Sequence, residues 1–112
     1  MQLLTVLSLA LSNALMVSAQ TKCTTWFYSD DSCKTLLEAV DTPCDYLSGP
    51  SCPSVNQTSQ IKSVKTDFPL DNGELLLYSK PGCEGDAKEQ LTNDCTPLES
   101  GETVASLGVQ NF

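Results

Sequence analysis

The chain has 112 residues, with 14 acidic and 6 basic side chains and a net charge of −8 at pH 7. This acidity argues against nucleic acid and anionic membranes as partners, because their phosphate groups would be repelled. All of the bases are lysines, so the guanidinium fork that usually holds phosphate is missing as well. The chain also has no histidine to activate a nucleophile, and we therefore expect no enzymatic activity.

Residues 1–19 have the pattern of a secretory signal peptide. Residues 3–17 are apolar except for small polar residues, and Val17-Ser18-Ala19 places small side chains where a signal peptidase cleaves. The alternative is a retained anchor, but the apolar run is short for a bilayer span, and no second run is longer. We expect cleavage after Ala19 and a secreted, extracellular chain that begins at Gln20 and does not contact a membrane.

Six cysteines follow the predicted signal peptide. They are Cys23, Cys33, Cys44, Cys52, Cys83 and Cys95. An even number in a short secreted chain predicts three disulfides, which a small hydrophobic core needs for its stability. A zinc site is not expected, because the chain has neither a Cys-x-x-Cys pair nor a histidine. We expect no metal and no cofactor.

Two strands are predicted early in the chain. Residues 24–29 are β-branched and aromatic, as strands prefer, and Asp30-Asp31-Ser32 supplies turn chemistry directly after them. Residues 34–40 have helix propensity, but a helix this short is unstable alone, and the corresponding residues 86–91 favour a strand. We expect Asp30 and Asp31 to be solvated turn formers rather than an acid–base pair. We expect Trp26 to be a core or half-core side chain rather than a platform for a sugar ring.

Residues 48–55 are predicted to form a stiff, protruding loop. Pro50, Pro53 and an anchored Cys52 would hold it rigid, and a rigid loop loses little entropy when it binds a partner. The binding candidates are Pro50, Ser51, Pro53 and Val55. The alternative is an insertion without a binding role. Asn56-Gln57-Thr58 follows as an N-glycosylation acceptor, and we expect a glycan on Asn56.

The remaining predicted strands are residues 60–67, 74–79, 86–91 and 103–110. Lys80-Pro81-Gly82 has the chemistry of a type II turn after the second of these. Pro69 and Asp71-Asn72-Gly73 give residues 68–73 the character of a turn-rich connection. Because this connection is short, the parts of the chain on its two sides should pack as one domain.

The two halves of the chain repeat one pattern. The interval from Tyr28 to Tyr78 equals that from Cys33 to Cys83, and a Ser-apolar strand ends each half. This pattern resembles the Greek-key motif of the βγ-crystallin superfamily, with an aromatic at the end of the first strand, a bulky residue five positions later, x-Gly, and a serine in the closing strand. The matching positions are Tyr28, Cys33, Thr35 and Ser63 in the first copy and Tyr78, Cys83, Gly85 and Ser106 in the second.

The resemblance implies an all-β fold with two Greek-key motifs, residues 20–68 and 69–112, in one sandwich of about eight strands. Thr35 replaces the family's glycine and should weaken the first copy. If equivalent cysteines form equivalent bonds, the expected pairs are Cys33–Cys44, Cys83–Cys95 and Cys23–Cys52. The windows that match the family's calcium signature, residues 58–63 and 101–106, lack its paired Asn or Asp, and Glu102 is the only acid in them that could bind the ion.

Small secreted proteins of this fold include killer-toxin-like antimicrobial proteins and a proteinase inhibitor. We therefore expect a monomeric, secreted, non-enzymatic interaction protein that acts on another organism as an effector, antimicrobial or toxin-like protein. Its partner would be an extracellular protein or a carbohydrate. The alternatives are a protease inhibitor that uses the 48–55 loop, and a calcium-binding or structural crystallin-like protein.

Overall fold

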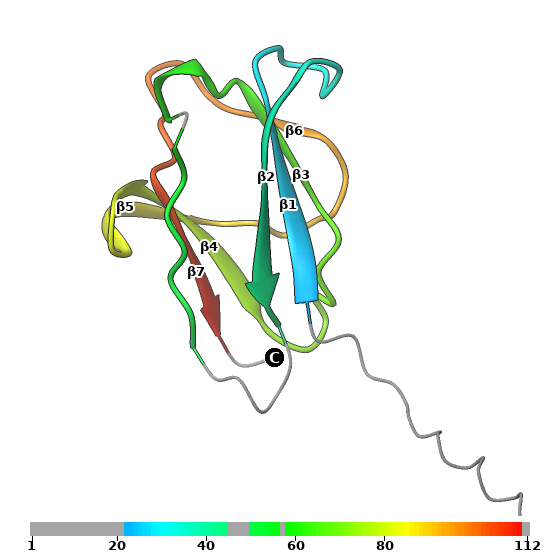
Figure 1. Cartoon of the computed structure of the whole chain (residues 1–112), viewed down its shortest axis with the longest axis vertical. Helices are drawn as coiled ribbons and strands as arrows, with labels where there is room; N and C mark the ends of the chain where they lie inside the picture. Colours follow the sequence, from blue (N-terminus) through cyan, green and yellow to red (C-terminus); the bar gives the residue numbers. More distant parts are fainter. Residues whose placement is uncertain (1–21, 45–49, 57, 111–112) are drawn as a thin grey trace, which may run out of the picture.

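The computed structural model describes residues 22–44, 50–56 and 58–110, so the predicted signal peptide lies outside the described residues. In the described ranges the chain is all-β and forms two antiparallel sheets with three disulfides (Figure 1). The predictions of an all-β chain and of three disulfides are confirmed. No helix in the described ranges has the length and hydrophobicity of a membrane span.

The first sheet has four strands, one of which comes from the second half of the chain. Its order is β2 (Leu36–Pro43), β1 (Lys22–Tyr28), β3 (Ser63–Thr66) and β6 (Thr96–Pro97). All three pairings in it are antiparallel. Residues 34–40 were expected to contribute a strand rather than a helix, and β2 confirms this. The two-residue strand β6 was not predicted.

The second sheet is completed by a segment from the first half of the chain. Its named strands are β5 (Glu84–Glu89), β4 (Glu74–Lys80) and β7 (Ser106–Gln110). Residues 51–55 run antiparallel along the free side of β7, where Ser51 and Val109 exchange two backbone hydrogen bonds of 2.7 and 2.9 Å. A short 3-10 helix, η3 (Thr58–Gln60), leads from this segment towards β3. Each sheet thus contains backbone from both halves.

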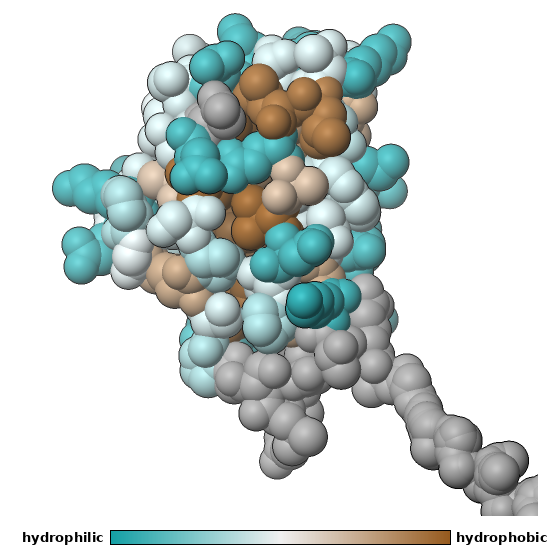
Figure 2. Space-filling model, viewed as in Figure 1, coloured by the Kyte–Doolittle hydropathy of each residue, from teal (hydrophilic) through white to brown (hydrophobic). Residues whose placement is uncertain are grey.

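One core lies between the two sheets. Along β1, buried side chains alternate with more exposed ones, and Phe27 is 0% exposed. It belongs to one cluster with Leu75 and Leu107 of the second sheet, which are also 0% exposed. Some hydrophobic surface remains in contact with solvent. It lies over the upper end of β2 in Figure 2, and Leu36 at the start of β2 is 54% exposed.

The disulfides follow the exchange of segments between the sheets. The predicted pairs Cys33–Cys44, Cys83–Cys95 and Cys23–Cys52 are all wrong; the observed pairs are Cys23–Cys44, Cys33–Cys95 and Cys52–Cys83. The reason is that Cys52 and Cys95 lie next to strands of the opposite half, within reach of that half's hairpin cysteine. Two of the three disulfides therefore join the two halves of the chain. The Cys33–Cys95 bridge spans 62 residues and, in the chain-entropy model, stabilises the fold by about 4 kcal/mol.

Burial predicts the order in which the disulfides are reduced in the folded protein. Cys23 and Cys44 are 0% and 4% exposed, whereas Cys52 and Cys95 are exposed. Brief treatment with a thiol should open Cys33–Cys95 and Cys52–Cys83 first, because their sulfurs are reached without unfolding. Alkylation followed by peptide mass spectrometry measures the order. Early labelling of Cys23 and Cys44 would contradict it.

Two buried threonines predict substitutions that stabilise the fold. Thr25 and Thr42 are 0% and 1% exposed, and their hydroxyls have no hydrogen-bond partner among the described residues. Thr25→Val and Thr42→Val should each raise the free energy of unfolding by about 1 kcal/mol, because a methyl group needs no partner. Urea unfolding measures this change.

Thr66→Val is the matched control, because the Thr66 hydroxyl donates to Asn93 Oδ1 at 2.6 Å. This substitution should lower the free energy of unfolding. Equal effects at all three positions would show that the hydrogen-bond state of the hydroxyl does not decide the outcome.

Candidate functional site at the loop end

Three connections gather at one end of the sandwich, called the loop end below. They are residues 29–35, 58–62 and 98–105, all at the top of Figure 1. The Leu98 N–H donates to the Lys62 carbonyl at 2.9 Å, which joins the second connection to the third. Between the connections lies a depression of about 450 Å³. Its polar lining consists of Asp31, Ser59, Lys62, Glu99, Ser100 and Glu102.

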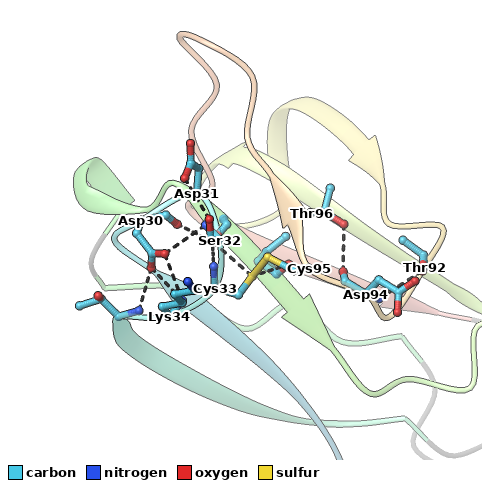
Figure 3. The surroundings of a disulfide bond; sticks show 12 residues. Asp30, Asp31, Ser32, Cys33, Lys34, Thr92, Asp94, Cys95 and Thr96 are labelled. Carbon is cyan, nitrogen blue, oxygen red and sulfur yellow. Dashed lines mark hydrogen bonds between the residues drawn. A yellow bond between two sulfur atoms is a disulfide. The ribbon is translucent and has the colours of Figure 1, made fainter.

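The first connection is held by the carboxylate of Asp30, as Figure 3 shows. It accepts the N–H groups of Thr35 at 2.7 Å, Lys34 at 2.9 Å and Ser32 at 3.1 Å. These N–H groups, that of Thr35 most strongly, hold the pKa of Asp30 below its ordinary value, against the opposing effect of desolvation. Asp30 therefore shapes the turn, as predicted, but its carboxylate is bound by the backbone. The carboxylate of Asp31, in contrast, is exposed.

A buried serine fixes each hairpin over its sheet. Ser63 Oγ accepts the Cys33 N–H at 3.1 Å and donates to the Asp30 carbonyl at 2.5 Å. In the second half, Ser106 Oγ accepts the Cys83 N–H at 2.9 Å and donates to the Lys80 carbonyl at 2.6 Å. Both serines are 0% exposed, and both cysteines have a φ of 58°. The two halves thus hold their hairpins by the same contacts.

The two hairpins differ at the position where the resemblance expects glycine. Gly85 has a φ of 81°, and a Cβ there would lie 2.4 Å from Ser79 Oγ, so a larger residue does not fit. Thr35 is not among the residues with positive φ. The Asp30 carboxylate closes the first turn around Thr35 instead. The first hairpin is therefore built with a different turn, and it is not simply a weakened copy of the second.

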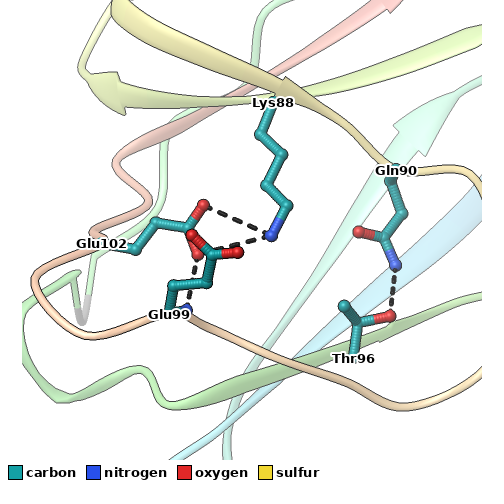
Figure 4. Close-up of polar contacts among 5 residues, drawn as sticks. All are labelled: Lys88, Gln90, Thr96, Glu99 and Glu102. Atoms are coloured by element: carbon teal, nitrogen blue, oxygen red, sulfur yellow. Dashed lines mark hydrogen bonds and ion pairs between the residues drawn. The ribbon is translucent and has the colours of Figure 1, made fainter.

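A second acid at the loop end, Glu102, is held by groups from two segments (Figure 4). Its Oε1 accepts the Glu99 N–H at 2.7 Å, and its Oε2 lies 3.4 Å from Lys88 Nζ. Sequence reasoning missed the pair, since Lys88 and Glu102 lie on separate segments and no local pattern connects them. The Glu102 carboxylate is therefore already paired with groups of the protein itself.

The loop end does not offer the ligands that calcium requires. Calcium takes six to eight oxygens, several from carboxylates. Glu102 is already paired with Lys88, and the ammonium of Lys62 borders the same depression. The described ranges contain no group of three or more His, Cys, Asp or Glu placed to hold a metal ion. The residues that correspond to the family's calcium windows therefore do not fit the ion.

The binding candidates of the predicted loop do not protrude where the structure describes them. Val55 is buried and donates its N–H to the Ala105 carbonyl at 2.9 Å, and Pro53 accepts the Leu107 N–H at 3.0 Å. Ser51 pairs with β7, and only Pro50 of the four candidates is exposed. The prediction of a protruding loop is wrong for residues 51–55, because this segment completes a sheet; residues 48–49 lie outside the described residues.

Two other predicted side chains lie at the surface. Asn56 is exposed and its N–H donates to the Glu38 carboxylate at 3.0 Å, so the acceptor position is accessible and its glycosylation stays a prediction. Trp26 lies on the outer face of the first sheet, opposite Ala39 and Lys65, and is half-buried. It therefore agrees with the half-core part of the prediction and does not belong to the core between the sheets.

The lowered pKa of Asp30 predicts a pH dependence. Because the pKa is lower in the folded state, the stabilisation is present at neutral pH and is lost as the pH falls through the folded-state pKa. Asp30→Ala should lower the melting temperature at neutral pH, and its difference from the unmodified protein should shrink in acid. Asp31→Ala is the control. A difference for Asp30→Ala that stays constant from neutral to acidic pH would contradict the assignment.

Comparison with known proteins assigns no family to this arrangement. No protein-family model, no curated protein and no solved structure matches the chain.

Proposed function

We propose that this chain is a secreted, non-enzymatic interaction protein of the βγ-crystallin-like Greek-key type. It acts on another organism as an effector or an antimicrobial, toxin-like protein. Its contact surface is the loop end, and its partner is an extracellular protein or carbohydrate.

The strand order supports the Greek-key part of the proposal. In the first half, β1 pairs with β2 and β3; in the second half, β4 pairs with β5 and β7. The remaining segment of each half, residues 51–55 or β6, returns along the other sheet. When residues 51–55 are counted as a strand, each half contributes four strands, and one strand of each half lies in the other half's sheet. Duplicated four-stranded units related in this way are the pattern that the resemblance implies.

The observation that carries the proposed function is the set of contacts that hold the first connection of the loop end. The Cys33–Cys95 disulfide, the Asp30 carboxylate and the buried Ser63 fix its first connection to the sheet below. A surface that is ordered before binding loses little conformational entropy on binding. Exposed charges and hydroxyls around the depression offer hydrogen bonds to a polar partner.

Neither alternative function is favoured by the geometry. A protease inhibitor needs an exposed reactive segment, whereas residues 51–55 donate and accept hydrogen bonds along β7. A calcium-binding role needs free carboxylates, whereas Glu102 is held by Lys88 and the Glu99 N–H.

The test applies oxidised protein without residues 1–19 to a panel of microbes and host tissues, and scores growth inhibition or a host response. Glu99→Gln removes one exposed charge from the loop end, and Asp71→Asn removes one from the connection at the opposite end (Figure 1). We expect activity that falls about tenfold with Glu99→Gln and is unchanged with Asp71→Asn, the loss typical of a central contact residue.

Two outcomes would contradict the proposal in different ways. Inactivity across the whole panel would contradict the effector or toxin role. Activity that is equally insensitive to both substitutions would contradict the loop end as its surface.

A further inference from the structure

The connection between β3 and β4 contains an Asn-Gly pair, Asn72-Gly73, in an exposed turn. The Asn72 N–H donates to the Pro69 carbonyl at 2.9 Å, which holds the turn. The Asn72 side-chain amide makes no hydrogen bond within the described ranges, and Gly73 has no side chain to hinder an approach to it. We propose that Asn72 is a site of spontaneous deamidation, where the Gly73 nitrogen attacks the Asn72 side chain.

The reaction needs only water and base. The Gly73 main-chain nitrogen loses its proton and bonds to Asn72 Cγ, the Cγ–nitrogen bond of the amide breaks, and ammonia leaves. The product is a five-membered succinimide. Water then opens one of its two carbonyl–nitrogen bonds, which gives either aspartate or isoaspartate, in which the main chain runs through the side-chain carbon.

Asn93 provides a control within the same protein. Its Oδ1 accepts the Thr66 hydroxyl at 2.6 Å and the Phe68 N–H at 2.9 Å, and its Nδ2 donates to the Phe68 carbonyl at 2.9 Å. All of these bonds must break before the side chain can turn towards the next nitrogen. That nitrogen belongs to Asp94 and donates to Thr92 Oγ1 at 3.1 Å. The fold therefore protects Asn93 and leaves Asn72 free.

Deamidation of Asn72 changes the charge of the chain and the backbone of the connection between β3 and β4, but it should leave the fold intact. Each conversion adds one negative charge to a chain that already carries −8. Isoaspartate adds one carbon to the main chain between the halves. The halves are also held by the Cys33–Cys95 and Cys52–Cys83 disulfides, so the turn can lengthen without separating them. We therefore expect a folded, more acidic form that accumulates with the age of the protein.

The test incubates the oxidised, folded protein in warm, mildly alkaline buffer and follows it by isoelectric separation and peptide mass spectrometry. After reduction and alkylation, trypsin releases residues 66–88, in which Asn72 is the only asparagine, and residues 89–112, in which fragmentation distinguishes Asn93 from Asn111. In the folded protein Asn72 should convert at least about tenfold faster than Asn93. Unfolding by reduction should accelerate Asn93 at least about tenfold and change Asn72 little. Labelling by an isoaspartyl methyltransferase identifies the isoaspartate product.

Two variants separate the site from general ageing. Asn72→Gln should remove the early acidic form, because glutamine cannot form the five-membered ring. Gly73→Ala should slow it through steric hindrance, and alanine suits a residue whose φ is not positive. An acidic form that persists at the same rate in both variants would overturn the proposal. Equal rates for Asn72 and Asn93 in the folded protein would do so as well.

Discussion

Neither half of the chain can complete its own sheet, and the rest of the structure depends on this constraint. Residues 51–55 lie along β7 of the second half, and β6 pairs with β3 of the first half. The hydrophobic core is consequently a single cluster that both halves fill. The two disulfides between the halves join each exchanged segment to the hairpin beside which it lies. Sheet formation, core burial and cross-linking therefore all involve the same segments of both halves.

The same hairpin is built twice with different chemistry. Ser63 and Ser106 each bind a hairpin cysteine N–H and a carbonyl of the preceding strand or turn. The second hairpin closes through the left-handed backbone of Gly85, and the first through the carboxylate of Asp30. The carboxylate gives the loop end a rigid first connection but makes it sensitive to acid, since protonation weakens the acceptor. Any binding surface at the loop end therefore depends on the charged Asp30 turn.

The sequence predicted the all-β class and the main strands, because β-branched and aromatic runs bounded by turn residues are local signals. It did not reveal residues 51–55 or β6 as parts of the sheets, since Pro53 and Pro97 interrupt both patterns and only long-range pairing places them there. The disulfide pairing failed for the same reason. Asp30 was recognised as a turn residue, whereas the pairing of Lys88 with Glu102 depends on two segments that only the fold brings together.

The two disulfides between the halves and the exchanged segments have one further consequence. If a protease cut the connection between β3 and β4, each half would still hold a strand-like segment in the other half's sheet and a sulfur bond to the other half. The cut would turn the protein into a two-chain molecule without releasing either fragment. In a medium rich in hydrolases, integrity at this position would then depend on sulfur and sheet pairing rather than on an unbroken peptide backbone.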